Sequence, residues 1–270
     1  MNNVQVIQKF NVQVIGDQEQ TLVMGHGFGS DQTAWRYQVA ALSSQYRIVL
    51  FDYLCCGQAD ISRYDPRHYT SLESYRDDVL EIFDALNLTQ ACFIGHSVSS
   101  MVGMLAAIAR PELITKLIFI GASTRYLNDG SYIGGFEQSD LDTLYETMAA
   151  NYIAWSNGFA PMAIANAERP ELGKEFSTRL SAMRPDIAQS TARIIFESDL
   201  RSQLTLIQQP VLILQAQRDI VVPQYVGEYL AAHIPRNKLV LLNAEGHLPH
   251  LSTPDEVLVA IQNFIPDNTI

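Results

Sequence analysis

The sequence predicts an α/β fold: a mostly parallel sheet with helices on both faces and a helical cap inserted into the chain. Short apolar runs alternate with helical patterns along most of the sequence, which is typical of βαβ units. The runs are continuously apolar, as in strands that are covered on both faces. Between residues 125 and 198 the alternation stops, and helical patterns follow one another without a strand.

Six apolar runs are expected to be strands of the sheet. They cover residues 21–24, 47–51, 91–94, 116–120, 211–214 and 238–242. The clearest helical patterns between and after them cover residues 71–88, 99–109, 224–234 and 254–264. Ser71 is a candidate N-cap of its helix, and Asp255 and Glu256 suit the positive end of the last helix dipole.

The stretch that interrupts the alternation is too long to be a connecting loop. It holds three or four helical patterns, near residues 139–152, 152–166, 170–183 and 185–198, divided by Gly or Pro. We expect residues 125–198 to form a lid over the carboxyl edge of the sheet, where α/β sheets carry their sites. Residues 1–124 and 199–270 then form one core domain.

Composition limits the possible partners and the compartment. The 270 residues carry a formal net charge of -11, which disfavours binding to nucleic acid and to anionic membranes. The N-terminal residues do not resemble a secretory signal, and no apolar run approaches the length of a membrane span. The three cysteines give no disulfide framework and no metal-ligand spacing. These features predict a cytoplasmic protein.

The strongest chemical signal is the pentapeptide Gly95-His96-Ser97-Val98-Ser99. It lies between a predicted strand and a helix of small residues, the context of a nucleophile elbow. Gly95 gives room beside Ser97, and the start of the following helix favours developing negative charge. The usual pattern ends in Gly, but Ser99 is also small enough for close packing. We therefore expect Ser97 to be a nucleophile.

A nucleophilic serine needs a base, and in this type of fold the base follows the last strand. His247 stands in that position, with Gly246 freeing the backbone before it. His250 is the alternative, but it lies nearer the final helix. His26 and His96 precede or adjoin the serine, so packing or hydrogen bonding around the elbow is the expected role of both.

The third catalytic group should orient the imidazole and stabilise its cation. Asp219 lies just beyond the predicted strand 211–214, between the serine and the histidine in chain order. Asp199 and Asp186 are alternatives, but both fall in helical cap sequence. Asp52 also follows a strand, but it precedes the serine, so a structural role in a turn is expected.

Two backbone N–H groups are expected to form an oxyanion hole. One belongs to Val98, the residue after the nucleophile. The other is expected from Phe28, in the glycine-rich loop Gly25-His26-Gly27-Phe28-Gly29 that follows the first predicted strand.

Taken together, these motifs resemble the α/β hydrolases around the bacterial stress regulator RsbQ and the related plant karrikin and strigolactone receptors. In those receptors the elbow also ends in Ser. The resemblance covers essentially the whole chain. In the core it is carried by His26-Gly27-Phe28-Gly29, Asp31-Gln32, Trp35, the elbow and Gly246-His247-Leu248-Pro249. In the cap it is carried by Arg125-Tyr126-Leu127-Asn128-Asp129, Gly134-Gly135-Phe136-Glu137, Gly158-Phe159-Ala160-Pro161 and Met183-Arg184-Pro185-Asp186-Ile187-Ala188.

The resemblance implies an α/β-hydrolase fold with a four-helix, V-shaped lid over an apolar pocket. It implies a monomer, no metal or organic cofactor, and slow hydrolysis of a small apolar ester or lactone. By position, seven aromatic residues would line the pocket: Phe28, Tyr126, Phe136, Trp155, Phe159, Phe176 and Phe196.

The sequence therefore predicts a serine hydrolase of the esterase or lactonase type. The alternative is a regulatory hydrolase that signals a bound or slowly hydrolysed ligand to a protein partner. For RsbQ-like proteins the resemblance implies that this partner is a phosphatase linked to a PAS domain. The triad residues do not separate the two hypotheses, since both retain them.

Overall fold

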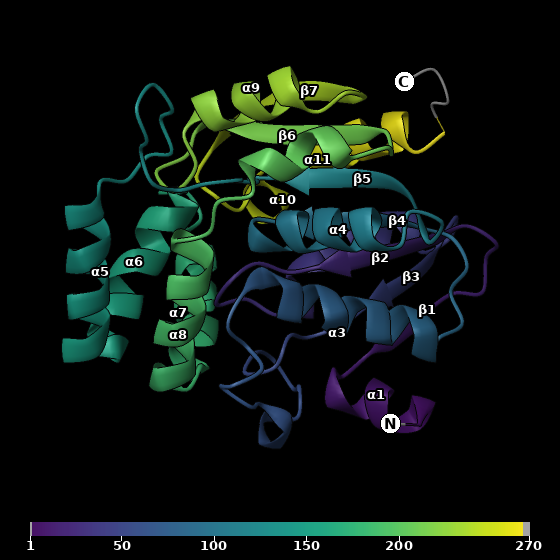
Figure 1. The fold of residues 1–270 in the computed structure, drawn as a ribbon, viewed down its shortest axis with the longest axis horizontal. Helices are drawn as coiled ribbons and strands as arrows, with labels where there is room; N and C mark the ends of the chain where they lie inside the picture. The colour runs from purple at the N-terminus through teal and green to yellow at the C-terminus, as the bar shows by residue number, and fades with distance from the viewer. Residues whose placement is uncertain (1, 267–270) are drawn as a thin grey trace.

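A seven-stranded sheet forms the centre of the computed structural model, which describes residues 2–266 (Figure 1). The strand order is β1-β3-β2-β4-β5-β6-β7. The strands are β1 (Gln13–Ile15), β2 (Thr21–Gly25), β3 (Arg47–Leu50), β4 (Ala91–His96), β5 (Ile114–Ile120), β6 (Val211–Arg218) and β7 (Asn237–Glu245). All neighbouring pairs are parallel except β1 and β3. The predicted mostly parallel α/β fold is confirmed.

The central strands consist mainly of buried apolar residues because both faces of the sheet are covered. Every residue of β2 and of β4 is buried. In contrast, β1 lies at one edge and its three residues are exposed or half-buried. This short strand has no continuous apolar run, so the sequence pattern did not reveal it.

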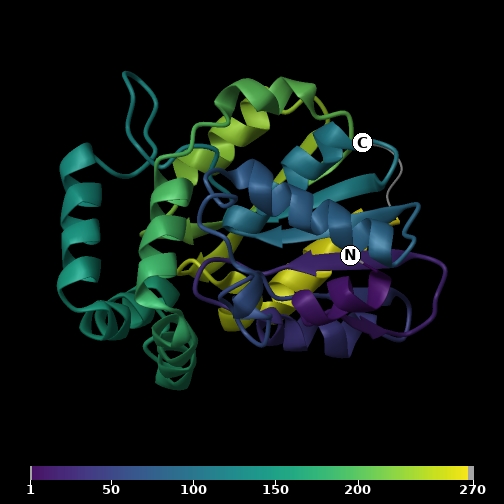
Figure 2. The same ribbon diagram turned by 60° about the horizontal axis from the view of Figure 1, so that its bottom comes forward.

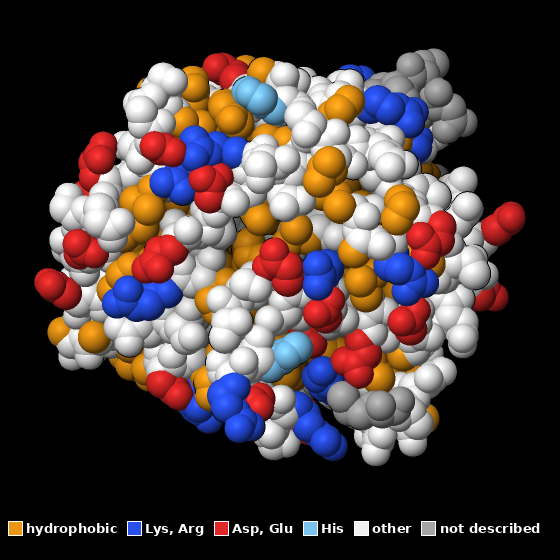
Figure 3. Space-filling model, in the orientation of Figure 1, with side chains coloured by type: hydrophobic (Ala, Val, Ile, Leu, Met, Phe, Trp, Pro, Cys, Tyr) orange, Lys and Arg blue, Asp and Glu red, His pale blue; other side chains and the backbone are white. Residues whose placement is uncertain are grey.

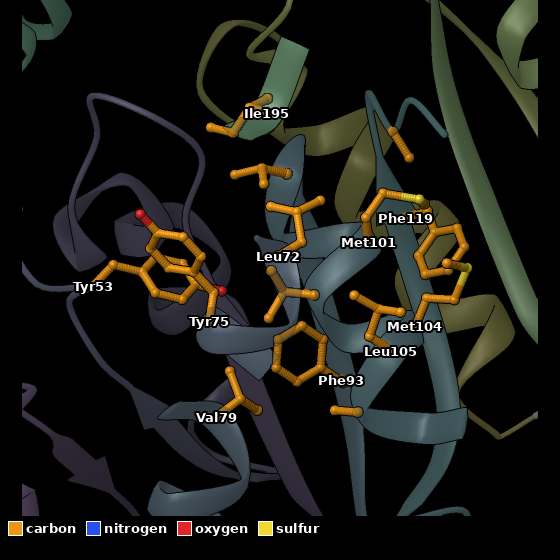
Figure 4. Close-up of a cluster of buried hydrophobic side chains, with 14 of the residues drawn as sticks. Tyr53, Leu72, Tyr75, Val79, Phe93, Met101, Met104, Leu105, Phe119 and Ile195 are labelled. Carbon is orange, nitrogen blue, oxygen red and sulfur yellow. The ribbon is translucent and has the colours of Figure 1, made fainter. Parts of the chain in front are cut away.

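Helices cover the two faces of the sheet, and the sheet separates two hydrophobic cores. On one face lie α1 (Asn3–Lys9), α3 (Leu72–Ala85), α4 (Val98–Ala109) and α9 (Gln224–His233). On the other lie α2 (Arg36–Leu42) and α11 (Pro254–Phe264), which pack around Trp35, Leu42 and Phe264. Short helical segments complete the core: η1 (Gln32–Trp35), η2 (Ile61–Arg63), η3 (Arg201–Leu206) and α10 (Pro249–Ser252). Figure 4 shows part of the first core, where Phe93 of β4 meets Leu105 of α4 and Val79 of α3.

Four helices between β5 and β6 stand apart from the layers that cover the sheet (Figures 1 and 2). They are α5 (Gln138–Ala150), α6 (Tyr152–Ile164), α7 (Pro170–Ala182) and α8 (Pro185–Phe196). Proline at the first helical position fixes the start of α7 and of α8, because it needs no intrahelical partner there. In both views α5 is the outermost element, while α7 and α8 lie next to the core. The four helical patterns expected from the sequence therefore all form helices.

Ser71 occupies the predicted N-cap position of α3 with extended backbone, but its side chain makes no capping hydrogen bond. The first turn of α11 contains Asp255 and Glu256, as expected from the helix dipole.

The surface carries charges of both signs. Figure 3 shows acidic and basic side chains interspersed on one face. No helix within residues 2–266 combines the length and the apolar character that crossing a membrane requires.

Candidate active site

Ser97 occupies a strained turn between β4 and α4. Its φ of 55° and ψ of -124° lie in a region that side chains other than glycine rarely adopt. The Ser97 N–H donates to the carbonyl of Ile120 at 2.8 Å, which anchors the turn to β5. A Cβ at Gly95 would lie 2.5 Å from the backbone nitrogen of Ser100, so no larger residue fits there. The turn thus holds the Ser97 hydroxyl at the end of the strand.

His247 follows β7 in a loop that touches α6. Gly246 has a φ of +85°, and a Cβ on it would collide with the carbonyl of Ile164. The His247 N–H donates to the carbonyl of Ala163 at 2.6 Å. From the other side, Nε2–H of His96 donates to the carbonyl of His247 at 2.8 Å. The backbone of His247 is therefore fixed both to α6 and to the elbow.

Asp219 lies in the turn after β6, and its side chain is only 1% exposed. Its Oδ1 accepts hydrogen bonds from the N–H groups of Val221 at 2.8 Å and Val222 at 3.1 Å. These bonds fix the rotation of the carboxylate and leave Oδ2 to face His247.

The structure brings the three side chains together. Nε2 of His247 lies 2.8 Å from Oγ of Ser97, although 150 positions separate the residues. Nδ1 of His247 lies 2.8 Å from Oδ2 of Asp219. Since the carboxylate accepts the Nδ1 proton, Nε2 is left with a lone pair directed at the serine hydroxyl. This arrangement allows proton transfer from Ser97 to His247 with Asp219 stabilising the resulting cation.

The alternatives left open by the sequence lie elsewhere. His250 is buried in α10 against Trp35, with ring centroids 4.8 Å apart. Asp52 accepts the N–H of Gln32 at 2.8 Å, as in a structural turn. Two further carboxylates, those of Asp186 and Asp199, pair with nearby arginines. None of these groups contacts the Ser97 hydroxyl or the His247 ring through a hydrogen bond in the described chain.

The glycine-rich loop after β2 passes directly beside the nucleophile. A Cβ at Gly27 would lie 3.2 Å from Cβ of Ser97, so Phe28 begins next to the reacting centre. Val98 is the first residue of α4, where an N–H group has no intrahelical partner. Neither N–H group forms any of the loop, turn or side-chain hydrogen bonds found within residues 2–266. Both are available for an anion near Ser97.

Above Ser97 lies an apolar pocket between the sheet and the lid helices. The space between atoms there, including any part open to solvent, is about 400 Å³. Five of the seven predicted aromatic residues line it: Phe28, Tyr126, Phe159, Phe176 and Phe196. Burial, with a further contribution from the Asp219 charge, raises the pKa of Tyr126 to about 12, so its hydroxyl stays protonated; its interaction with Ser97 acts in the opposite direction.

Phe136 and Trp155 are not on the pocket wall, contrary to the sequence prediction. Phe136 packs against the outside of Phe196, with ring centroids 5.5 Å apart. The rings of Tyr152 and Phe159 stack on Trp155 at 5.6 and 5.2 Å. Both residues thus support aromatic neighbours from a second layer.

Three apolar residues that the sequence analysis missed also line the pocket: Ala163, Ile195 and Val221. Ile195 is the residue before Phe196 in α8, and Val221 follows the Asp219 turn. This adjacency to predicted site residues is the only sequence signal for Ile195 and Val221.

Three other histidines are buried around the site. Burial lowers the pKa of His26, and lowers that of His250 to about 3. For His96, burial and then the neighbouring His250 and His247 hold the pKa well below its ordinary value. Both ring nitrogens of His250 lack a hydrogen-bond partner within the described residues. These imidazoles are therefore neutral in the folded protein at neutral pH.

We expect these histidines to make stability depend on pH. The unfolded chain binds their protons below about pH 6.5 while the folded chain does not, so stability is complete above that pH and falls with acidification. From pH 7 to pH 5, His250 alone should lower the free energy of unfolding by about 2 kcal/mol. Urea titrations of the wild type and of His250→Gln at both pH values measure this effect.

Comparing the wild type with His250→Gln cancels the contribution of the other titrating groups to the change in unfolding free energy. Asp78, whose pKa burial raises to about 6, is one of these and acts in the opposite direction. Wild type should lose about 2 kcal/mol more than the variant on acidification. An equal loss in both would contradict a neutral, buried His250.

Comparison with known proteins agrees with this geometry. Residues 20–254 match the family described as the alpha/beta hydrolase fold. The chain is 47% identical to strigolactone esterase RMS3 of Pisum sativum over 92% of this chain and 94% of that protein. It is 44% identical to the Karrikin insensitive 2 receptor CA of Petunia hybrida over 96% of this chain and 97% of that protein. A solved structure of a hydrolase from Oleispira antarctica superposes with a TM-score of 0.96 at 36% identity, covering 99% of this chain and 98% of that one.

These relatives confirm the family resemblance that the sequence motifs predicted, and they support a hydrolase of the esterase type. The chain belongs to the α/β-hydrolase family.

Proposed function

We propose that this protein is a serine hydrolase that cleaves a small apolar ester or lactone through an acyl-enzyme. The observation that carries the proposal is the continuous hydrogen-bonded chain from Ser97 through His247 to Asp219 at the base of an apolar pocket. Each link is 2.8 Å long, within the range needed for proton transfer.

In the first step, Nε2 of His247 takes the proton of Ser97 while Oγ forms a bond to the substrate carbonyl carbon. The carbonyl π electrons move to the oxygen, and the N–H groups of Phe28 and Val98 bind the resulting oxyanion. The bond to the alcohol oxygen then breaks. Nε2–H of His247 gives its proton to that oxygen, which leaves an acyl-Ser97 ester and a neutral alcohol.

Water completes the cycle by the same route. His247 takes one proton from water as its oxygen bonds to the acyl carbon, and it returns that proton to Oγ of Ser97 as the acyl bond breaks. The products are a carboxylic acid, the alcohol and the free serine. Asp219 remains ionised throughout and stabilises the histidine cation in both halves.

Residues 125–198 act as the lid, and residues 1–124 and 199–270 as the catalytic core. The support is that α6, α7 and α8 supply Phe159, Phe176 and Phe196 to the pocket wall. Such a lid excludes water from the reacting groups and strengthens their electrostatic interactions.

The aromatic wall favours a small substrate with few polar groups. The relatives named strigolactone esterases support an ester or lactone as the scissile group. We place the protein in the reducing cytoplasm, since its three cysteines are all free.

A second function, ligand-dependent signalling to a protein partner, is favoured by relatives that are named receptors. The chain is 44% identical over 96% of its length to one of them. In this function a bound or slowly cleaved ligand changes the lid surface, and the partner recognises that surface. A phosphatase linked to a PAS domain is the candidate partner if the protein acts as RsbQ-like proteins do.

Turnover and thermal melting on the same panel of esters separate the two functions. The panel contains 4-nitrophenyl acetate, butyrate and octanoate and an unsaturated γ-lactone. As a metabolic esterase, the protein should turn over at least one ester with kcat above about 1 s⁻¹. A regulator should turn over all of them far more slowly and change its Tm with the preferred ligand. Absence of both turnover and melting change would refute both functions.

A further inference from the structure

A second chamber lies beside the oxyanion loop, the glycine-rich segment Gly25–Gly29 that follows β2 and carries Phe28. The space between atoms there, including any part open to solvent, is about 380 Å³, nearly as much as at the pocket above Ser97. Its wall comes from Gly27 and Phe28 of the oxyanion loop, Val98 of the elbow and side chains that include Tyr53, Tyr75 and Thr191. Neither Ser97 nor His247 lines it.

The two spaces share a wall formed by Phe28 and Ile195, which line both. Val98 also lines the chamber and is the residue directly after the nucleophile. Figure 4 shows Ile195 of α8 above Tyr53 and Tyr75, whose rings lie 5.7 Å apart. A group attached to the carbonyl carbon at Ser97 therefore needs only to pass Phe28 and Ile195 to enter the chamber.

The chamber is mainly apolar but holds one hydroxyl pair with a spare proton. Oη of Tyr75 lies 3.0 Å from Oγ1 of Thr191, and both residues are buried. One hydroxyl donates to the other, so the proton of the accepting hydroxyl has no protein acceptor in the described chain. The Tyr53 hydroxyl, in contrast, is hydrogen bonded to Ser99 at 2.9 Å. A buried donor without an acceptor favours a ligand that supplies one.

The stereochemistry of acyl transfer decides which part of a substrate can reach this chamber. The alcohol oxygen must receive its proton from Nε2 of His247, so the alcohol part extends into the pocket that His247 lines. The acyl part leaves the same tetrahedral carbon in a different direction. The chamber, which opens beside Val98 and lacks His247, is the space available to it.

We propose that this chamber is the acyl subsite, and that it selects short acyl groups carrying a hydrogen-bond acceptor, such as a ketone, three carbons beyond the ester carbonyl. This acceptor would receive a hydrogen bond from the hydroxyl of the Tyr75–Thr191 pair whose proton has no protein acceptor. This inference rests on the proposed acyl-transfer function and adds the class of acid that the enzyme releases.

Two esters of equal shape test the proposal. In 4-nitrophenyl 4-oxopentanoate a ketone oxygen replaces the branching methyl group of 4-nitrophenyl 4-methylpentanoate. The ratio of their kcat/KM values measures selection for the acceptor. In the double variant Tyr75→Phe/Thr191→Val this ratio should fall about tenfold, because the wall keeps its shape but loses both donors. Each single variant leaves one hydroxyl and should lose less.

Thr178→Val is the matched control, since Thr178 is exposed on α7 and its hydroxyl bonds only to its own helix. Its ratio should equal that of the wild type. An unchanged ratio in the double variant would overturn the acyl-subsite proposal.

If the wild type cleaves no ester, acyl transfer itself fails, and calorimetry with the unreactive N-phenyl amides of the two acids tests the chamber separately. A structure of the wild type with the 4-oxopentanamide gives the same decision if the double variant does not fold: a ketone away from the hydroxyl pair overturns the proposal.

Discussion

Ser97→Ala should lower kcat for 4-nitrophenyl butyrate by about 10⁴-fold or more. The substitution removes the only oxygen that lies 2.8 Å from Nε2 of His247 within the described chain and that can form the acyl bond. The strained φ of 55° is disfavoured for alanine as well, but that strain is already present in the wild type. We therefore expect the variant to fold and to bind the ester without acylating. Stopped-flow turnover and the absence of a nitrophenol burst measure the effect.

Ser100→Ala is the appropriate control for Ser97→Ala. Ser100 is buried in the same elbow, but its hydroxyl donates to the carbonyl of Gly95 at 2.8 Å and does not line the pocket. Its kcat should stay within about threefold of wild type, since only one internal hydrogen bond is lost. More than about one per cent of wild-type turnover in Ser97→Ala would exclude the acyl-enzyme mechanism.

Asp219→Asn should lower kcat by about 10⁴-fold, through the histidine tautomer. Oδ1 of Asp219 accepts the N–H groups of Val221 and Val222, so asparagine keeps its oxygen there and turns its NH₂ group towards His247. Nδ1 must then accept a hydrogen bond, and the imidazole proton moves to Nε2. A protonated Nε2 cannot take the proton of Ser97. Steady-state kinetics on the same ester measure the loss.

Asp186→Asn serves as the matched carboxylate. Asp186 was an alternative on sequence grounds, but it is exposed and paired with Arg184 at 2.7 Å. Its substitution should leave kcat unchanged, because a surface ion pair contributes little and lies outside the site. Near-normal activity of Asp219→Asn would show that another group orients His247.

The sequence was sufficient for the residues whose position follows from chain order. Ser97, Asp219 and His247 each follow a strand of a parallel sheet, and the carboxyl ends of such strands meet at one edge. The continuous apolar runs identified six of the seven strands because both faces of the sheet are covered. The missing strand, β1, pairs antiparallel with β3 at an exposed edge, where no apolar run is required.

Residues whose role depends on lid packing could not be assigned in the same way. Aromatic character alone does not distinguish Phe196, which faces the pocket, from Phe136, which packs behind it. Ile195 was missed because an aliphatic residue in an amphipathic helix is most often core. The second chamber was also invisible, since Tyr53, Tyr75 and Thr191 come from three distant segments.

The hydrogen bond from His247 to Ala163 ties the catalytic base to the roof of its own site. Movement of α6 away from the core would break one of the two hydrogen bonds that fix the His247 backbone and leave only the one from His96. The alignment of the imidazole with Ser97 is therefore fully supported only when α6 lies against the core. Opening of the lid at α6 would therefore also loosen the catalytic base, which couples access to the pocket with the alignment of His247.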